Sequence, residues 1–178
     1  LLEQTQFTQT GPDTGRRLSH LDPGNQPPLA VIDQCILLAL CLNIHNTQPS
    51  HGLTSEQMSA FVERVIQHPL NWSVHTMSLL LRSRLEASRT RTVERSTLQL
   101  QALIDQMPTN DSSVRERLRF FHALELPAKW AMQSELAHRY VSIGVLRSAL
   151  ETFERVEMWE NVVQCLGLLG RQQEGIEV

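Results

Sequence analysis

Five arginines within a short stretch are the residues best suited to chemistry: Arg82, Arg84, Arg89, Arg91 and Arg95. A guanidinium group binds carboxylates and phosphates through paired hydrogen bonds, so such a cluster can dock an acidic peptide or an RNA backbone. Glu86 and Glu94 lie among the arginines, and simple local ion pairing at a solvated helix end is the interpretation we favour. We keep the five arginines as candidate partner-binding residues. No aromatic residue interleaves with them, which argues against base stacking.

The histidines and cysteines show no catalytic or metal-binding spacing. The seven histidines form neither H-x-x-x-H nor H-E-x-x-H. Cys35 and Cys41 are six residues apart and fall on different faces of a helix, so together with Cys165 they are interpreted as core thiols in a reducing compartment. Walker A, Rossmann and G-x-S-x-G motifs are also missing from the sequence. We therefore expect no enzyme, no cofactor, no metal and no small-molecule substrate.

Charge and hydropathy narrow the class of partner. The formal net charge of −3 gives no overall attraction to nucleic acid or to an anionic membrane. The longest wholly apolar run is residues 35–42, well short of the roughly 20 residues that span a bilayer. We expect a cytoplasmic protein, with the nucleus as a second location. Because the sequence begins at Leu1 and ends within a repeating pattern, we expect a piece of a longer chain.

The elements that would position these residues are helices. Residues 1–28 are polar and rich in Gln, Thr, Gly and Pro, which predicts a flexible lead-in. Residues 29–126 form the helical-hairpin region, since short connections between helices favour antiparallel neighbours and no period-2 segment occurs. Its first helix, "AVIDQCILLALCLNIHN", is apolar nearly all round, as in a buried helix. Thr54 or Ser55 is expected to cap the second helix.

Apolar residues at helical spacing also predict the later helices. In "SSVRERLRFFHAL" they are Val114, Leu118 and Phe121, which would fall on one face of a helix. A further helix is predicted from Pro127 to about Ile143. Met77 and Trp130 are interpreted as core residues because of their helical spacing.

Two glycines 26 residues apart, Gly144 and Gly170, indicate a repeat over residues 127–178. Glycine adopts the left-handed conformation that ends a helix, so each unit is a helix, a glycine turn and a second helix. Such units must stack to bury their apolar faces. Phe153 and Trp159 are expected to fill the gap toward the next unit. The structural residues that define the repeat are Leu136, Ala137, Tyr140, Gly144, Ala149, Phe153, Trp159 and Gly170.

Residues 136–153 match the offsets of the tetratricopeptide repeat, although the 26-residue interval is shorter than the usual ~34 residues. A longer resemblance adds to this match. The segments "NWSVHTMSLLLRSRLEASRTRTVERSTLQLQALIDQ" and "ALETFERVEMWENVVQC" resemble the tetratricopeptide repeat protein 27 family. That resemblance covers about residues 27–178. The resemblance implies a non-enzymatic adaptor, and that this sequence comes from the middle of a longer chain. It also implies an association with chaperone-assisted assembly of other complexes. The family supplies no catalytic or cofactor residues.

We therefore predict an all-α protein: an α-solenoid of antiparallel helix pairs leading into tetratricopeptide-like repeats, cut at the C-terminus. The predicted function is a protein–protein interaction scaffold that docks a partner peptide or helix in a groove. Arg-mediated RNA binding or ribonucleoprotein docking is the alternative, and a coat- or transport-complex solenoid is a third. The Lys, Asn and Arg clamp with which some tetratricopeptide domains hold chaperone tails is incomplete here, because Lys129 is the only lysine.

Overall fold

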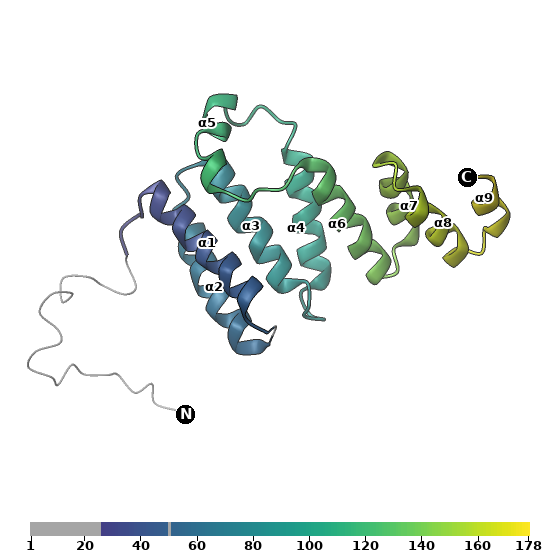
Figure 1. Ribbon diagram of the computed structural model, residues 1–178, viewed down its shortest axis with the longest axis horizontal. Helices are drawn as coiled ribbons and strands as arrows, with labels where there is room; N and C mark the ends of the chain where they lie inside the picture. Colours follow the sequence, from purple (N-terminus) through teal and green to yellow (C-terminus); the bar gives the residue numbers. More distant parts are fainter. Residues whose placement is uncertain (1–25, 50) are drawn as a thin grey trace, which may run out of the picture.

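A computed structural model of the chain describes residues 26–49 and 51–178, and every regular element in this part is a helix (Figure 1). The all-α prediction is confirmed. Most of the predicted lead-in lies outside the described residues. The elements are α1 (Val31–Thr47), α2 (Gly52–Gln67), α3 (Trp72–Glu86), α4 (Val93–Gln106), α5 (Val114–Leu118), η1 (Phe121–Ala123), α6 (Lys129–Ser142), α7 (Leu146–Arg155), α8 (Trp159–Leu168) and α9 (Gln172–Glu177).

The helices pack against their neighbours in chain order and form an elongated stack, with α1 and α2 near one end and α9 at the other (Figure 1). One exception is α4, which packs against α6 because α5 lies to the side. A large apolar cluster holds α1 to α4 and the start of α6 together, and a smaller one joins α6, α7 and α8. The order of pairs along one axis is that of an α-solenoid. None of the helices described is both long and apolar enough to cross a membrane.

The caps at the starts of α2 and α3 are His51 and Asn71. At α2 the cap is His51, whose Nδ1 accepts a hydrogen bond from the amide of Thr54 at 3.4 Å. Thr54 is buried inside the first turn and donates its hydroxyl to the Pro49 carbonyl. The predicted Thr54 or Ser55 cap is therefore wrong. At α3, Asn71 accepts from the amides of Ser73 and Val74, as an N-cap asparagine does.

The first helix is not buried all round. Its inner face packs against α2 and α3 through residues such as Leu38 and Cys41. Its outer face exposes Ile32, Ile36 and Leu40, which recur every four residues. The prediction of a fully buried helix is wrong, because among the described residues the neighbours of α1 lie on one side only.

The segment after α4 also differs from expectation. A helix with Val114, Leu118 and Phe121 aligned was predicted, but the helix ends at Leu118 and a short 3₁₀ turn follows. All three side chains are exposed. Apolar spacing predicts a helix, but it does not reveal whether another element covers the apolar face.

The repeat region turns at regular intervals of thirteen residues. Gly144, Glu157 and Gly170 have φ values of 80°, 58° and 74°. After each of them the next amide bonds back to the last turn of the preceding helix, as from Val145 to Tyr140 at 2.8 Å and from Arg171 to Leu166 at 2.9 Å. This pattern is the Schellman motif, which ends a helix at a left-handed residue. The 26-residue interval therefore consists of two such steps, and Glu157 occupies a position that favours glycine.

The turns predict opposite effects for two substitutions. Gly144→Ala should destabilise the protein by about 1 kcal/mol, because left-handed backbone costs a side chain roughly that much. No atom lies within 4 Å of the added methyl group, so the cost is purely conformational. Glu157→Gly should stabilise by less than about 1 kcal/mol, since the gain is offset by the entropy of glycine. Urea unfolding of both variants measures the change in the free energy of unfolding. Changes of the same sign in the two variants would contradict the prediction.

Of the residues that define the repeat, Ala137, Ala149 and Phe153 lie in the small cluster, and Leu136 lies in the large one. Leu136, Ala137, Ala149 and Phe153 are buried and Tyr140 is partly so. The two tryptophans differ: Trp130 is 67% exposed and Trp159 is 52% exposed. The expectations that Trp130 is core and that Trp159 fills a gap are wrong. Both stand in the first turn of a helix, on an edge that no described neighbour covers.

Candidate protein-docking groove

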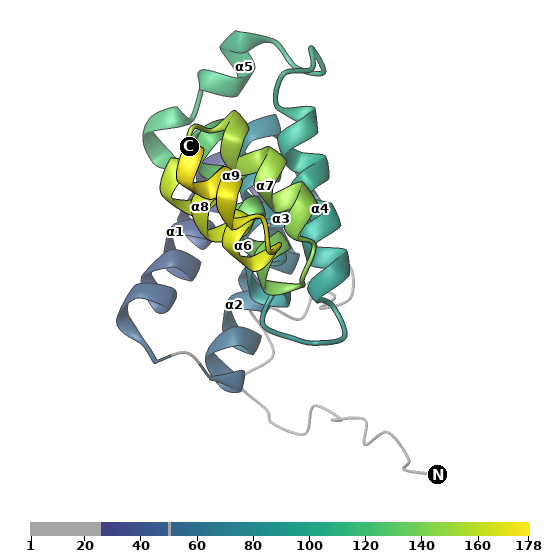
Figure 2. The ribbon, with the colours of Figure 1, turned by 90° about the vertical axis from the view of Figure 1, so that its right-hand side faces the viewer.

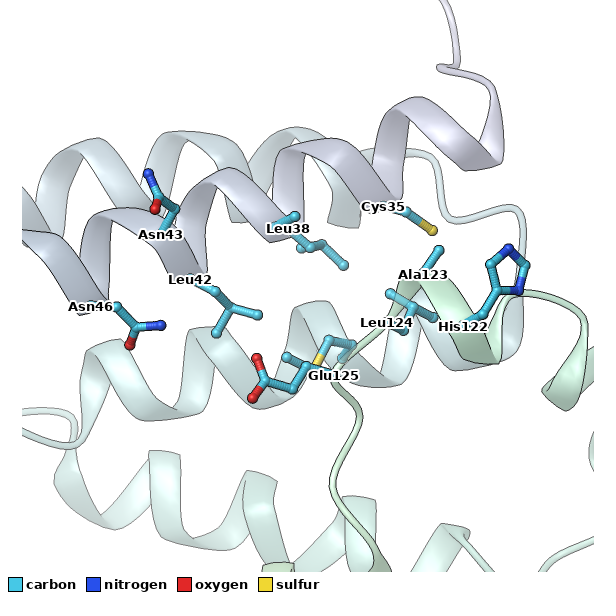
Figure 3. Close-up of a pocket in the computed structure, with 11 residues that line it drawn as sticks. Cys35, Leu38, Leu42, Asn43, Asn46, His122, Ala123, Leu124 and Glu125 are labelled. Atoms are coloured by element: carbon cyan, nitrogen blue, oxygen red, sulfur yellow. The ribbon is translucent and has the colours of Figure 1, made fainter.

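A groove runs along α1 where that helix faces α3 and the segment 121–127. One of its cavities, of about 480 Å³, lies between α1 and this segment (Figure 3). Leu38 and Leu42 of α1, Met77 of α3 and Leu124 line it with apolar surface. Asn46 and Glu125 lie at one end and His122 at the other (Figure 3). A volume of this size lies in the range of ligand pockets, which spans roughly 300–1,000 Å³.

Two further cavities extend the groove past Leu42. One of about 520 Å³ is lined by His45, Arg84, Phe121 and Pro127 as well as by Leu42. The other, of about 250 Å³, continues between α1, α2 and α3. Leu42 lines all three cavities, so they form one continuous depression along the second half of α1. We call it the α1 groove.

The side chains that line the α1 groove offer apolar contact and hydrogen bonds. Burial raises the pKa of the Cys35 thiol at its floor, so that the thiol is protonated at neutral pH and is a poor nucleophile. Deeper in the core, burial raises the pKa of Cys41 to about 11. Across residues 26–49 and 51–178, no three His, Cys, Asp or Glu side chains are placed to hold a metal ion. Apolar contact and hydrogen bonds from Asn46 and His45 are what the groove provides.

Three of the five candidate arginines are engaged in local ion pairs. Arg82 and Arg95 both bind Glu86, at 3.0 and 2.9 Å. Burial alone would raise the pKa of Glu86, but its bonds to the two arginines outweigh burial and hold that pKa below the usual range. Arg84 forms a two-point contact with Glu135 of α6.

The other two arginines, Arg89 and Arg91, stand exposed in the turn between α3 and α4. Within the described part of the chain they form no ion pair, and Glu94 forms none either. The structure thus separates the arginine cluster into a paired set of three and a free pair. Local pairing, the interpretation favoured from the sequence, involves Glu86 and Glu135 rather than Glu94.

A buried polar network joins α3, α4 and α6, and sequence reasoning did not find it. Arg139, only 9% exposed, donates to the Ser83 hydroxyl at 2.6 Å and to the Glu135 carboxylate at 2.5 Å. Ser83 in turn donates to the Ser96 carbonyl at 2.8 Å. The i, i+4 spacing of Glu135 and Arg139 could have indicated their ion pair from the sequence. The contact between Arg139 and Ser83 could not be found in this way, because the two residues are 56 positions apart. The network ties the helical-hairpin region to the repeats.

Comparison with known proteins covers most of the chain. A TPR repeat-containing protein of Schizosaccharomyces pombe is 42% identical in an alignment of 192 positions, gaps included, that covers 90% of this chain and 24% of that protein. The tetratricopeptide repeat protein 27 homolog of Dictyostelium discoideum is 39% identical over 147 residues, 83% of this chain and 17% of that protein. The resemblance to the tetratricopeptide repeat protein 27 family is confirmed. The Saccharomyces cerevisiae protein named Essential for maintenance of the cell wall protein 1 is 30% identical over 174 residues, 90% of this chain and 19% of its own length.

The chain spans between 17% and 24% of the length of these curated relatives. No family model matches it, and no solved structure does. The names of its tetratricopeptide relatives and its stacked helix pairs together support a helical-repeat scaffold for protein interactions. In such scaffolds, function depends on the surface that the stacked helices present, which here includes the α1 groove.

Proposed function

We propose that the protein is a non-enzymatic adaptor of the cytoplasm and nucleus that holds a segment of a partner protein in the α1 groove. The observation that carries the proposal is the continuous apolar depression through Leu42, bordered by polar side chains. Participation in chaperone-assisted assembly of other complexes belongs to the same proposal. Its support is the resemblance to the tetratricopeptide repeat protein 27 family.

The shape of the groove favours a short extended segment. The lining residues of α1 run from Cys35 to Gln48, a rise of about 20 Å at 1.5 Å per residue. That length accommodates roughly six residues of extended chain. Apolar side chains of the segment would fill the cavities, and Asn46 and His45 offer hydrogen bonds to its backbone.

Blocking the groove is the direct test. Ala39 is exposed and lines the cavity of about 480 Å³, so Ala39→Arg places a long side chain in the groove without disturbing the core. Capture of protein partners from cytosolic extract, quantified by mass spectrometry, should fall about tenfold or more, as expected when a central contact is lost. Ala102→Arg is the matched control, because Ala102 is an exposed alanine in the middle of α4. Equal capture by both variants would overturn the groove proposal.

The RNA-binding alternative rests on the free pair Arg89 and Arg91. To separate RNA binding from groove docking, the unaltered protein and a variant carrying Arg89→Glu and Arg91→Glu are each used as bait, with and without nuclease. Groove docking predicts that the same proteins are captured in all four of these conditions. Capture that is lost with nuclease, or with the reversed charges, would place the site at the arginines, because phosphate binding depends on net positive charge.

A further inference from the structure

The segment between α4 and α6, residues 108–128, forms an arm outside the helix stack. Both views place α5 at the outer edge of the molecule (Figures 1 and 2). Neither α5 nor η1 contains a buried residue. Val114, Leu118 and Phe121 expose 71%, 58% and 70% of their surface. These three side chains therefore contribute little to the core, whereas Phe120, Leu124 and Leu126 of the same arm pack against it.

The arm is nevertheless firmly attached to the start of α3. The side-chain amide of Asn71 donates to the Glu116 carbonyl at 3.0 Å, and the Ser73 hydroxyl donates to the Arg117 carbonyl at 2.7 Å. Both donor residues are buried. The Arg117 guanidinium lies 4.0 Å from the centre of the Trp72 ring and also donates to the carbonyl that follows α4. Apolar side chains on a backbone held in this way lose little conformational entropy when a partner covers them.

The exposed apolar residues lie beside positive charge. Arg115 and Arg119 are exposed and form no ion pair within the part of the chain that the structure describes. Arg117 is already engaged with Trp72, and the Glu116 carboxylate accepts a hydrogen bond from the Ser112 hydroxyl at 2.7 Å. The Arg119 guanidinium lies 5.4 Å from the centre of the Phe120 ring, a contact that leaves its N–H groups able to pair. A partner that approached the apolar side chains would therefore meet two guanidinium groups without a carboxylate partner. The surface formed by Val114, Arg115, Leu118, Arg119 and Phe121 is called the α5 ridge below.

We propose that the α5 ridge docks an acidic amphipathic helix of a partner protein. Val114 and Leu118 stand one helical turn apart, and Phe121 follows three residues later. Phe121 belongs to η1 and not to α5, so the three side chains are neighbouring exposed anchors rather than one helical row. A helix whose own apolar residues recur at i, i+4 and i+7 offers three side chains to contact them. Acidic side chains beside those anchors would pair with Arg115 and Arg119 and set the orientation. This surface is distinct from the α1 groove, with which it shares only Phe121.

Charge and length favour a protein over a membrane or RNA. The whole chain carries a net charge of −3, and Glu151, Glu154 and Glu160 are exposed on α7 and α8. A membrane or a long RNA extends past the ridge and would meet these carboxylates, whereas a short acidic helix contacts the ridge alone. In addition, α5 has only five residues, so it cannot lie in a membrane interface as a longer amphipathic helix does.

The test selects partners without assuming their identity. Helical peptides of about 14 residues, or four turns, are selected from a randomised display library on the protein. Fluorescence anisotropy then gives the affinities of the selected peptides. We expect sequences that are net negative, with apolar residues at i, i+4 and i+7. Leu118→Asp should weaken their binding about tenfold or more. The paired change Arg115→Glu and Arg119→Glu should weaken it about tenfold and favour peptides whose Glu residues are replaced by Lys.

Matched controls separate the ridge from other surfaces. Leu98→Asp changes an exposed leucine of α4, and Arg89→Glu with Arg91→Glu changes two exposed arginines elsewhere. Neither change should move the affinity by more than about twofold. Circular dichroism of every variant should match that of the unaltered protein, because all the substituted side chains are exposed.

Several results would overturn the proposal. Selected peptides that are neutral or basic would do so, as would peptides whose affinity does not depend on Leu118. Phosphatidylserine-containing vesicles or a uridine oligonucleotide that bound the ridge more tightly than any acidic peptide would point to another class of partner. If Ala39→Arg abolished peptide binding while Leu118→Asp did not, the peptides would occupy the α1 groove. In that case the ridge proposal would fail and the proposed function would stand.

Discussion

Replacing Phe153 with alanine is expected to destabilise the repeat region by about 3–5 kcal/mol, the usual cost of emptying a phenylalanine site in a core. Phe153 is 1% exposed and lies in the small cluster that joins α6, α7 and α8. Its ring also meets the His138 ring edge-on, with centroids 5.0 Å apart. No other large side chain in that cluster is positioned to fill the space, so the cavity would persist.

The loss should be local, because repeats in a solenoid contact only their neighbours. Amide hydrogen exchange followed by mass spectrometry should show faster exchange in α7 and α8 and unchanged exchange in α1 to α3. Leu98→Ala is the control, since Leu98 is exposed and its truncation should cost less than about 0.5 kcal/mol. Faster exchange along the whole chain would contradict the view that the two clusters are separate cooperative units.

Removing the Glu135 carboxylate is the second change with a large expected effect. Glu135→Ala leaves the buried Arg139 cation with only the hydroxyl and carbonyl oxygens of α3 and α4 as partners. Breaking a buried ion pair from one side costs about 3–5 kcal/mol. Since Glu135 is partly exposed, we expect about 3 kcal/mol, measured by urea unfolding.

Arg84→Met is the matched control for this network. Arg84 also binds Glu135 but is itself exposed, and its loss leaves the bond between Glu135 and Arg139 intact. An exposed ion pair contributes less than about 1 kcal/mol. If Arg84→Met lowered the free energy of unfolding as much as Glu135→Ala does, the exposed pair of Arg84 and Glu135, and not the buried Arg139, would account for the stabilisation.

The network also predicts how stability changes with pH. Burial would raise the pKa of Glu135, but the hydrogen bonds and charges of Arg84 and Arg139 hold it below the ordinary value of 4.5. A carboxyl group with a lowered folded-state pKa stabilises the protein above its unfolded-state pKa, and this contribution is lost as pH falls through the folded-state value. The stability difference between the unaltered protein and Glu135→Gln should therefore be constant near neutral pH and shrink below about pH 4.5. A difference that grows with acidification would contradict the assigned charge state.

Local patterns predicted the helices and their turns well. The helices predicted over residues 30–46 and from Pro127 to about Ile143, and the glycine turns at Gly144 and Gly170, occur where the sequence placed them. Both depend on interactions within a few residues, namely helical spacing and the left-handed freedom of glycine. The third left-handed turn, at Glu157, could not be predicted, because glutamate carries no such preference.

Burial was the property that local patterns predicted poorly. The same apolar spacing describes the buried Met77 and the exposed Leu118, and it does not distinguish the inner face of α1 from the outer one. The α1 groove was not predicted either, because its walls come from α1, α3 and residues 121–127. Nor was the contact between Arg139 and Ser83, which brings together residues 56 positions apart.

The sequence by itself determined the helical class, the 26-residue interval of the repeat and the family resemblance, since each resides in residue types and spacings along the chain. Only the tertiary structure decided which apolar faces are covered, which arginines are paired and where a groove opens. The physical reason is that side-chain burial and ion pairing depend on the neighbours that folding brings together, and in this chain those neighbours lie far apart in the sequence.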